Sequence, residues 1–355
     1  MRIHELKLRL REAGAGPLHQ QRFLRMWAQA LPRDSGKRKA ETFFPASLMA
    51  ALPGIDADLA ALARVDSAHP GADGSERLLV ALGDGQTVES VLLPRGGLCV
   101  SSQVGCAVGC RFCMTGRDGL LRQVGSAEIV AQVVLARQRR AVSKVVFMGM
   151  GEPAHNLDNV MEAIELLGTA GNIGHKNLVF STVGDPRAFE RLRQAVVKPA
   201  LALSLHTSDA ALRRTLLPRA PLMTPEQLVN EADAYARATG YPVQYQWALL
   251  QGVNDTDEEI DGIVRLLAGR YGVLNMIPFN EVEGAGFSRP SRERCREIAE
   301  VLHRRGVLTK LRDSAGQDVD GGCGQLRARV ARAGAVATEV PVAMPSGRAA
   351  VRETH

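Results

Sequence analysis

The amino-acid sequence predicts an α/β fold, a full or partial barrel of parallel strands with helices outside it, preceded by a small helical domain. From Cys99 onward, short apolar segments alternate with amphipathic ones, as in repeated β–α units of a parallel sheet. Apolar residues form 45% of the 355-residue chain, enough to fill one large domain with a small appendage. In such folds catalytic groups lie at the carboxyl ends of strands, where we expect the site.

The first segment, residues 1–70, is expected to form the small helical domain. Apolar residues recur at helical spacing from Phe23 to Leu31, and Pro32 ends the run. Residues 1–40 carry ten Lys or Arg against three acids, so their net charge is +7. Such a face neutralises RNA phosphates, although a solvated basic surface without a partner has the same composition. Because aromatic residues are only 4% of the chain, extended base stacking is not expected.

The main domain is expected over residues 71–326 and opens with a β-hairpin at 77–93 that turns around Asp84. One later helix is expected to begin after a cap at Ser126, and another after Thr224, where a proline follows at the first helical position. Residues 327–355 lose the pattern and predict a flexible tail. Short apolar segments predict the barrel strands at 98–101, 144–148, 177–181, 200–205, 243–249, 273–277 and 307–311.

Three cysteines spaced C-x₃-C-x₂-C, Cys106, Cys110 and Cys113, give the most specific chemical signal. A structural zinc site takes four protein ligands, and no fourth cysteine is nearby. A [4Fe–4S] cluster on three thiolates leaves one iron open, where an amino acid's amine and carboxylate can chelate. This is the ligand set of radical S-adenosylmethionine (SAM) enzymes, so we expect a [4Fe–4S] cluster and SAM. A zinc knuckle completed by a distant residue, or three buried thiols, are the alternatives.

The distribution of cysteines favours a cytoplasmic enzyme. Cys99, Cys295 and Cys323 are scattered outside the cluster segment, unlike the cysteines of a secreted disulfide scaffold. The sequence has no run of 18 apolar residues for a membrane span and opens with no secretory signal. An oxygen-sensitive cluster and free thiols both indicate a reducing compartment.

A glycine-rich loop, residues 148–153, follows the strand expected at 144–148. Gly151 allows a ligand to approach the backbone closely, and Glu152 can accept a hydrogen bond from the methionyl amine of SAM. Alone, this loop could be an ordinary β–α turn; after the cysteine motif it indicates a SAM site.

Further polar groups stand at strand ends, where they could bind ribose hydroxyls or the SAM carboxylate. Each alone could equally be a turn or cap residue, and Asn254 could simply cap the helix that follows it. These candidates are Ser181, Ser204 with its neighbours Leu205 and His206, and Asn254.

The cysteines outside the cluster motif differ in setting. Cys323 is flanked by glycines, so it is poorly placed for packing and well placed to react. Cys99 lies on the first barrel strand, where a buried small side chain is the alternative to a chemical role. Cys295 lies within an expected helix and has only a packing or surface interpretation.

From about residue 75 to 326 the chain resembles the radical-SAM adenine methyltransferases of RNA, the RlmN/Cfr group. The N-terminal region resembles the family's small RNA-binding domain more loosely, through residues 17–27. The motifs that carry the resemblance occur in family order: residues 98–106, 113–116, 148–153, 204–206, 252–255 and 320–326.

The resemblance implies a partial (β/α)6-type radical-SAM barrel that methylates an adenine carbon, C2 being favoured. Ribosomal RNA is the implied substrate, with transfer RNA as a second one. Methylation at C8 of adenine in 23S ribosomal RNA, or action on another RNA, stays open as an alternative. An electron donor such as flavodoxin or ferredoxin is the implied protein partner, and no membrane is involved.

The resemblance also assigns roles to residues and implies two SAM molecules per turnover. Cys323 takes a methyl group from one SAM, and a second SAM is reduced to a 5′-deoxyadenosyl radical. That radical takes hydrogen from the methylated Cys323, whose methylene radical adds to the adenine carbon. Cys99 then attacks Cys323 to release the product, leaving a disulfide bond. Glu89 matches the family's proton acceptor, with an exposed strand residue as the alternative.

Two departures from the family concern the substrate more than the chemistry. Gly321 and Gly322 stand where the family commonly has alanines, so a looser loop is expected. The basic tract at 37–39 is not a family feature. A radical-SAM enzyme for small molecules would not need the Cys99–Cys323 pair, and a non-catalytic RNA-binding iron–sulfur protein would not need Glu152.

Overall fold

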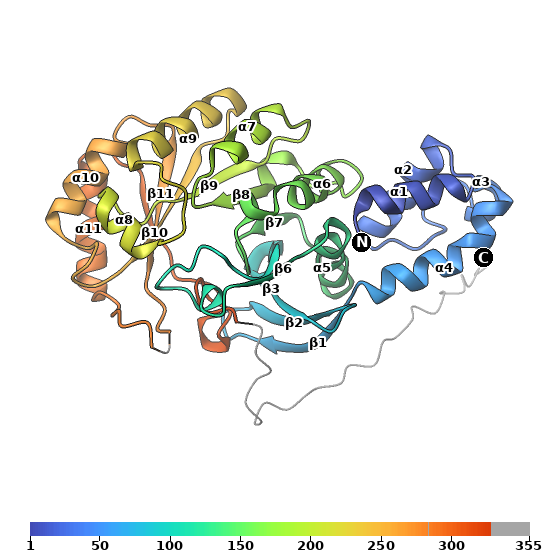
Figure 1. Cartoon of the computed structure of the whole chain (residues 1–355), viewed down its shortest axis with the longest axis horizontal. Helices are drawn as coiled ribbons and strands as arrows, with labels where there is room; N and C mark the ends of the chain where they lie inside the picture. The colour runs from blue at the N-terminus through green and yellow to red at the C-terminus, as the bar shows by residue number, and fades with distance from the viewer. Residues whose placement is uncertain (283, 328–355) are drawn as a thin grey trace, which may run out of the picture.

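The computed structural model of the chain describes residues 1–282 and 284–327 (Figure 1). Its main sheet is antiparallel from β1 to β4 and parallel from β4 onward, in the order β1-β2-β3-β4-β7-β8-β9-β10-β11-β12. Among the described residues, β1 and β12 do not pair with each other, so the expected partial barrel is confirmed. The strands are β1 (Ala63–Pro70), β2 (Glu76–Leu82), β3 (Thr87–Leu93), β4 (Gly97–Cys99), β7 (Lys144–Phe147), β8 (Leu178–Thr182), β9 (Ala200–Ser204), β10 (Val243–Leu249), β11 (Gly272–Pro278) and β12 (Thr309–Leu311).

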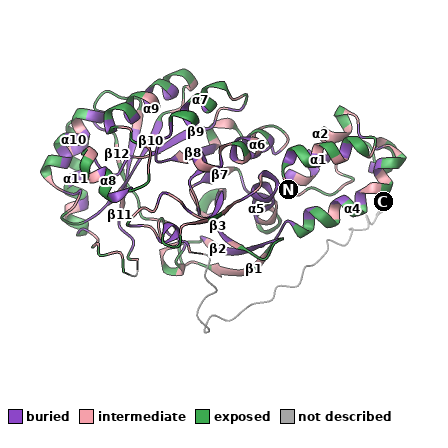
Figure 2. Ribbon diagram, in the orientation of Figure 1, coloured by how far each residue is buried: buried purple, intermediate pink, exposed green. Residues whose placement is uncertain are grey.

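Helices cover the outside of the parallel strands, and their inward faces are buried while their outward faces are exposed (Figure 2). Four helices precede the sheet: α1 (Ile3–Glu12), α2 (Pro17–Ala28), α3 (Ala40–Phe43) and α4 (Ala46–Ala61). The remaining α-helices are α5 (Ser126–Arg139), α6 (Leu157–Gly168), α7 (Pro186–Gln194), α8 (Ala210–Leu216), α9 (Pro225–Thr239), α10 (Asp257–Leu267) and α11 (Arg292–Arg304). Short 3-10 turns lie at Pro94–Gly96, Met114–Gly116, Pro153–Asn156, His175–Asn177 and Gln317–Val319.

The expected hairpin and barrel strands are present, but two strand elements were not expected. Strand β1 lies within the segment assigned to the helical domain, yet it pairs with β2 from Ala63 to Pro70. A separate two-stranded ribbon, β5 (Gln103–Gly105) with β6 (Leu120–Gln123), frames the cysteine motif.

The predicted caps of the two helices have different outcomes. Thr224 caps α9, because its hydroxyl accepts from the Gln227 backbone N–H at 3.2 Å. At α5 the cap is Gly125, so the prediction for Ser126 is wrong. The Ser126 hydroxyl instead accepts from the Ile3 backbone N–H at 2.8 Å and donates to Glu162 at 2.5 Å.

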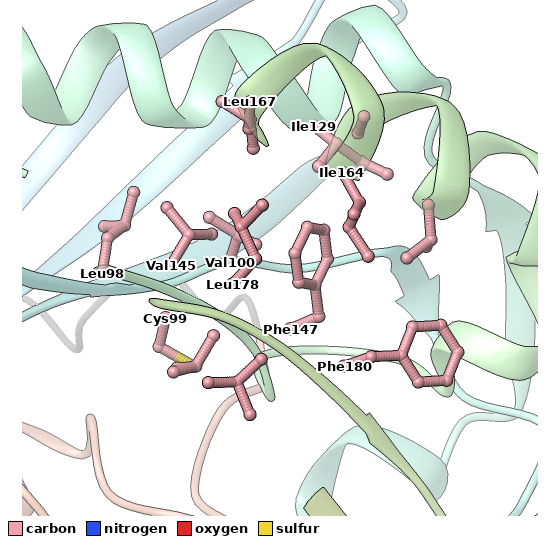
Figure 3. Close-up of a cluster of buried hydrophobic side chains, with 14 of the residues drawn as sticks. Leu98, Cys99, Val100, Ile129, Val145, Phe147, Ile164, Leu167, Leu178 and Phe180 are labelled. Carbon is pink, nitrogen blue, oxygen red and sulfur yellow. The ribbon is translucent and has the colours of Figure 1, made fainter. Parts of the chain in front are cut away.

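The core beneath α5 and α6 is formed by side chains from alternate positions of the parallel strands (Figure 3). Leu98 and Val100 lie on one side of β4 and its continuation, while Cys99 lies on the other. Phe147 and Phe180, on β7 and β8, are almost fully buried in the same core. Cys99 is therefore buried with its sulfur directed away from α5.

The N-terminal helices pack against the barrel through a shared core. Ile3 is fully buried, and apolar residues of α1, α2 and α4 belong to the same cluster as those of the sheet. The Gln29 side chain donates to the Ala170 carbonyl at 2.6 Å, and Arg137 donates to the Ala28 carbonyl at 2.6 Å. In the part of the chain that the structure describes, no helix is long and apolar enough to cross a membrane. The expected tail, apart from Arg327, lies outside the described residues.

Candidate active site

The cysteine motif lies on the loop between β5 and β6 and is anchored through its backbone. The Cys106 N–H donates to the Gly119 carbonyl at 2.9 Å, and the Arg111 N–H donates to the Leu216 carbonyl of α8 at 3.0 Å. Gly105 has φ +78°, and a Cβ atom there would lie 2.0 Å from the Gly119 carbonyl oxygen. Only glycine fits this position, so Gly105 fixes the backbone conformation with which the cysteine loop begins after β5.

A cavity of about 170 Å³ opens at the carboxyl ends of the parallel strands. It brings together the cysteine motif, the glycine-rich loop and the loop of Cys323, which are far apart in the sequence. The predicted site residues that line it are Cys106, Cys110, Cys113, Gly151, Glu152, Ser181, Ser204, His206 and Cys323, and Gln246 and Asn280 line it as well.

The three motif thiols interact electrostatically within this cavity. The pKa of Cys106 is raised to about 12, mainly by burial and also by negative charge on Glu152 and Cys113. The pKa of Cys110 is raised in the same way, first by burial and then by the other two thiols. A strongly positive group is therefore needed to hold all three as thiolates. Among residues 1–282 and 284–327, no three His, Cys, Asp or Glu side chains are grouped closely enough to hold a single metal ion.

Glu152 is buried at the floor of the glycine-rich loop. Its carboxylate accepts from the backbone N–H groups of Ala154 and Val183, each at 3.0 Å. Burial nevertheless raises the pKa of Glu152 to about 7. Gly151 has φ +104°, and a Cβ atom there would meet the Gln103 side chain at 2.6 Å. The loop thus places a carboxyl group of near-neutral pKa at the cavity.

His206 ends β9 as a buried, neutral imidazole. Its backbone has φ +62°, and its Nδ1 accepts from the Ala248 N–H at 2.9 Å. Burial lowers the pKa of His206 to about 3, so its Nε2 carries the proton and can donate. The ring packs edge-on against Phe112 of the cysteine loop, with centroids 4.8 Å apart. Leu205 is fully buried and does not line the cavity.

Asn254 does not reach the cavity, contrary to its predicted cofactor contact. Its amide nitrogen donates to the His206 and Ala248 carbonyls, at 2.7 and 2.8 Å, and its oxygen accepts from the Leu250 N–H at 2.7 Å. All its polar atoms are therefore used inside the protein. Nor does Asn254 cap α10, whose cap is Thr256.

Asn280, which the sequence reasoning missed, is the asparagine that lines the cavity. Its nitrogen donates to the Ser314 hydroxyl and to the Cys323 carbonyl, at 3.0 and 2.9 Å. Its oxygen is buried without a hydrogen-bond partner in the described residues. Asn280 follows β11, so the search for polar residues at the carboxyl ends of strands, which selected Ser181 and Ser204, would also have found it.

Two of the three cysteines outside the motif, Cys99 and Cys323, approach each other at the cavity. Cys323 is exposed and lines it, whereas Cys99 is buried beside it. Burial raises the pKa of Cys99, and charge on Cys323 raises it further, so the thiols are electrostatic neighbours. All six cysteines are within the described residues, and each is a free thiol. Cys295 is buried in α11, as its packing interpretation requires.

The loop that carries Cys323 is fastened at several points, so it is not the looser loop that its glycines suggested. The Gly321 N–H donates to the Gly316 carbonyl at 2.7 Å, and the Met114 N–H donates to the Gly324 carbonyl at 2.7 Å. A Cβ atom on Gly322 would lie 2.5 Å from the Gln325 side chain. The small residues here permit close packing rather than mobility.

Glu89 is buried, so the alternative of an exposed strand residue is wrong. Its carboxylate pairs with Arg77 and also accepts from the backbone N–H of Arg327 at 2.7 Å. Glu89 does not itself line the cavity. In this arrangement it fastens the chain just after Cys323.

Comparison with known proteins agrees with this geometry. Residues 100–267 match the Radical SAM superfamily. The chain is 72% identical to a probable RNA methyltransferase of Aromatoleum aromaticum over 95% of both chains, and 65% identical to one of Thiobacillus denitrificans over 99% of both. It superposes on the crystal structure of a radical SAM methyltransferase from Sphaerobacter thermophilus with a TM-score of 0.79 and 34% identity, covering 93% of this chain and 98% of that one. The protein therefore belongs to the radical-SAM RNA methyltransferases.

Proposed function

We propose that this enzyme methylates an adenine carbon, C2 being favoured, in ribosomal RNA and also in transfer RNA. One observation carries the proposal: a single cavity unites the three-cysteine loop, a set of polar strand-end groups and a further cysteine, Cys323. Radical-SAM chemistry on a small molecule needs no such extra thiol. Adenine C2 and C8 are electron-poor, so they cannot attack a SAM methyl group as nucleophiles. A protein-bound methyl carrier provides another route to methylation of these carbons.

The residues present fit a [4Fe–4S] cluster with SAM on its open iron. Cys106, Cys110 and Cys113 would hold the cluster, because three thiols that line one cavity, where charge on one raises the pKa of another, need a positively charged partner. When bound, the cluster and SAM supply a 5′-deoxyadenosyl radical. Glu152 would receive the methionyl amine, while Ser181 and Ser204 face the same cavity.

His206 and Asn280 complete the set of groups that can orient SAM. The neutral His206 offers an Nε2–H donor, and Asn280 offers an unpartnered carbonyl oxygen. We assign the cofactor contact of the sequence prediction to Asn280 instead of Asn254, whose polar atoms are all used.

Cys323 would act as the methyl carrier and Cys99 as the resolving thiol. The Cys323 thiolate would take the methyl group of one SAM, with S-adenosylhomocysteine as the leaving group, and a second SAM would supply the radical that activates this methyl group. Once the methylene carbon is bonded to adenine, the Cys99 thiolate would attack the sulfur of Cys323 and break its bond to that carbon. The adenine carbon would lose its proton and the methylene carbon would gain one, and the disulfide left behind would need a thiol reductant. The proximity of the two thiols supports this pairing. The proton-acceptor role of Glu89 rests on the family resemblance alone.

RNA would bind along the N-terminal helices. A groove of about 1000 Å³ runs between α2 and α6, and the loop after α2 also lines it. Its cations can neutralise several phosphates, and the site needs no base-stacking platform there. The cations lining this groove are Lys7, Arg22, Arg25, Lys37 and Arg38. A small electron-transfer protein such as flavodoxin or ferredoxin would reduce the cluster, in keeping with a cytoplasmic location.

Mass mapping of modified adenosines tests the proposal. Ribosomal and transfer RNA from cells with and without this gene are digested and compared, and 2-methyladenosine should disappear when the gene is deleted. Restoring the gene should restore it, whereas a Cys323→Ala copy should not. Loss of 8-methyladenosine instead would establish the alternative carbon. No change in any methylated adenosine would refute the proposed function.

A further inference from the structure

Arg213, on helix α8, is a buried cation to which none of the roles above applies. It is 4% exposed, and its Nη2 donates to the carbonyls of Val183, at 2.5 Å, and of Ser204, at 3.1 Å. Both carbonyls lie where β8 and β9 end. The guanidinium therefore sits just behind the two strand ends that bring Ser181 and Ser204 to the cavity.

Within the described residues, Arg213 has no ion-pair partner at salt-bridge distance, although Glu152 and Cys110 interact with it electrostatically. Within the described ranges, Arg77 and Arg213 are the buried arginines, and Arg77 is paired with Glu89. No carboxylate of residues 1–282 or 284–327 forms an ion pair with Arg213, and its Nε is buried without a hydrogen-bond partner. Burying a cation without an ion pair is costly, so a ligand of the site is expected to supply further negative charge.

The anionic groups that interact electrostatically with Arg213 belong to the site. Glu152 accepts from the N–H of Val183, the residue whose carbonyl accepts from Arg213. The cysteine loop is itself fastened to α8 through Leu216. Burial lowers the pKa of Arg213 to about 10, while negative charge on Cys110 and Glu152 opposes that shift. Arg213 therefore stays protonated at neutral pH.

We propose that Arg213 is a positioning residue whose fixed charge compensates the iron–sulfur cluster and favours its reduction. The inference rests on the proposed function, because it assumes a cluster on Cys106, Cys110 and Cys113. Three thiolates around an oxidised [4Fe–4S] core carry one net negative charge, and reduction by one electron adds a second. A cation behind the loop stabilises the more negative state more strongly.

The experiment compares three variants of the full-length protein after anaerobic reconstitution. Arg213→Gln removes the charge but keeps a polar side chain, and Arg213→Lys keeps the charge. Arg214→Gln is the matched control, since Arg214 is the exposed neighbour on the same helix. Iron content is counted, and the midpoint potential is measured by electron paramagnetic resonance during a redox titration. We expect Arg213→Gln to lower the equilibrium constant for reduction about tenfold, equal to about 59 mV for one electron. Arg213→Lys and Arg214→Gln should keep the wild-type potential.

The outcomes separate this inference from the proposed function. A wild-type protein that binds no cluster removes both. If the wild type binds a normal cluster, and Arg213→Gln keeps full iron content and an unshifted midpoint potential, only the proposed role of Arg213 is refuted.

A second measurement covers a variant that fails to assemble the cluster. In the full-length apoprotein, removing a buried charge without an ion pair should leave the melting temperature of Arg213→Gln unchanged or raised. A fall in melting temperature that Arg213→Lys shares would show that Arg213 merely clamps two strand ends, and would overturn the inference.

Discussion

Asn254 and Asn280 follow neighbouring parallel strands, β10 and β11, yet only one has a polar atom left for a ligand. The amide of Asn254 is used by three backbone groups, whereas the Asn280 oxygen has no partner among the described residues. Both residues are asparagines in the segment that follows a parallel strand. They differ in whether the surrounding backbone already forms hydrogen bonds with all the polar atoms of the side-chain amide.

This difference predicts opposite effects of the same substitution. Asn280→Ala should weaken SAM binding about tenfold, since one hydrogen bond to a charged ligand group contributes about 1.5 kcal/mol, with little loss of stability. Asn254→Ala should instead reduce the free energy of unfolding by about 2–4 kcal/mol, because it leaves buried backbone groups unpaired. Isothermal titration with SAM and chemical unfolding measure the two effects. Equal effects on SAM affinity would contradict the assignment.

The two lone cysteines should also fail differently. Cys323→Ala removes the methyl carrier, so neither a methylated protein nor an RNA adduct forms. Cys99→Ala keeps the carrier but lacks the resolving thiol, so RNA should remain covalently attached through Cys323. Denaturing gels and mass spectrometry of the peptide containing Cys323 detect the adduct. Normal methylation by Cys99→Ala without a crosslink would make Cys99 structural only.

Glu152 predicts a pH dependence of stability. Its pKa is raised by burial from 4.5 to about 7, so the folded protein binds a proton that the unfolded chain releases. The stability gained from that proton is complete below pH 4.5 and is lost as the pH rises toward 7, about 3 kcal/mol in all. Thermal unfolding of the full-length apoprotein between pH 5 and 8 should show this loss, and Glu152→Gln should lack it. If the melting temperatures of wild type and Glu152→Gln depend on pH in the same way, Glu152 is not the group that causes the loss of stability.

At the scale of elements, the sequence predicts well what depends on local pattern. The parallel strands from β4 to β12 were found because each is a short apolar run between helices. Strand β1 was missed because Arg64, Asp66 and His69 interrupt its apolar residues, and its pairing with β2 shifts register after Val65. The ribbon of β5 and β6 was missed because its short strands carry polar residues, Gln103 in β5 and Arg122 and Gln123 in β6, and so do not form an apolar run. Tertiary pairing, which a local pattern does not contain, forms all three.

The same distinction applies to the site. The three cluster cysteines, Glu152 and Cys323 could be predicted, because motif spacing and strand ends are visible in the chain. Neither the anchoring of Glu89 by Arg77 nor the buried position of Arg213 could be. Both depend on contacts between segments far apart in sequence.

The turn between β1 and β2 holds the loop of Cys323. The Asp73 carboxylate accepts from the Gly316 N–H at 3.0 Å, and Asp318 accepts from the Ala72 N–H at 2.8 Å. Asp73 also accepts from the backbone N–H of Ser75 at 2.9 Å, which fixes the turn itself. An element at the edge of the sheet thus positions the reactive cysteine.

Asp73→Ala should therefore release this loop. We expect Cys323 to react with iodoacetamide several-fold faster, and methyl transfer from SAM to Cys323 to slow by a similar factor. Asp73→Asn, which keeps one carbonyl acceptor, should retain most of the wild-type behaviour. Asp84→Ala is the matched control at the next hairpin turn, where it contacts Gln86 and Arg122. An unchanged alkylation rate in Asp73→Ala would show that the turn does not position Cys323.

At the scale of the whole molecule, the N-terminal helices are part of the core and not a detachable module. Ile3, Leu6 and Leu10 are fully buried in the cluster that continues into the sheet. Deleting the first 62 residues would expose this surface, so truncation cannot separate RNA binding from folding. Charge substitution can, since Arg25, Lys37 and Arg38 are exposed along the groove.

Replacing Arg25, Lys37 and Arg38 together with Glu should weaken RNA binding at least tenfold. It should also flatten the dependence of log affinity on log salt by about three phosphate contacts. SAM cleavage without RNA should be unchanged. The same exchange at Arg292, Arg296 and Arg304, exposed on α11, is the matched control. Fluorescence anisotropy over a salt series measures both, and equal losses in the two triple variants would refute a specific groove.

The fastening of the Cys323 loop to the β1–β2 turn has a consequence for how the chain is made. Asp73 leaves the ribosome 243 residues before Gly316, its partner. The cysteine motif and most of the parallel strands can therefore fold while the carrier thiol is still being synthesised. Closing so long a loop is among the slowest contacts to form. A chain released early would hold Cys106, Cys110 and Cys113 without Cys323. Because Cys323 follows Gly316 closely, we expect the β1–β2 turn to be fastened and the Cys323 loop to be positioned together, late in synthesis.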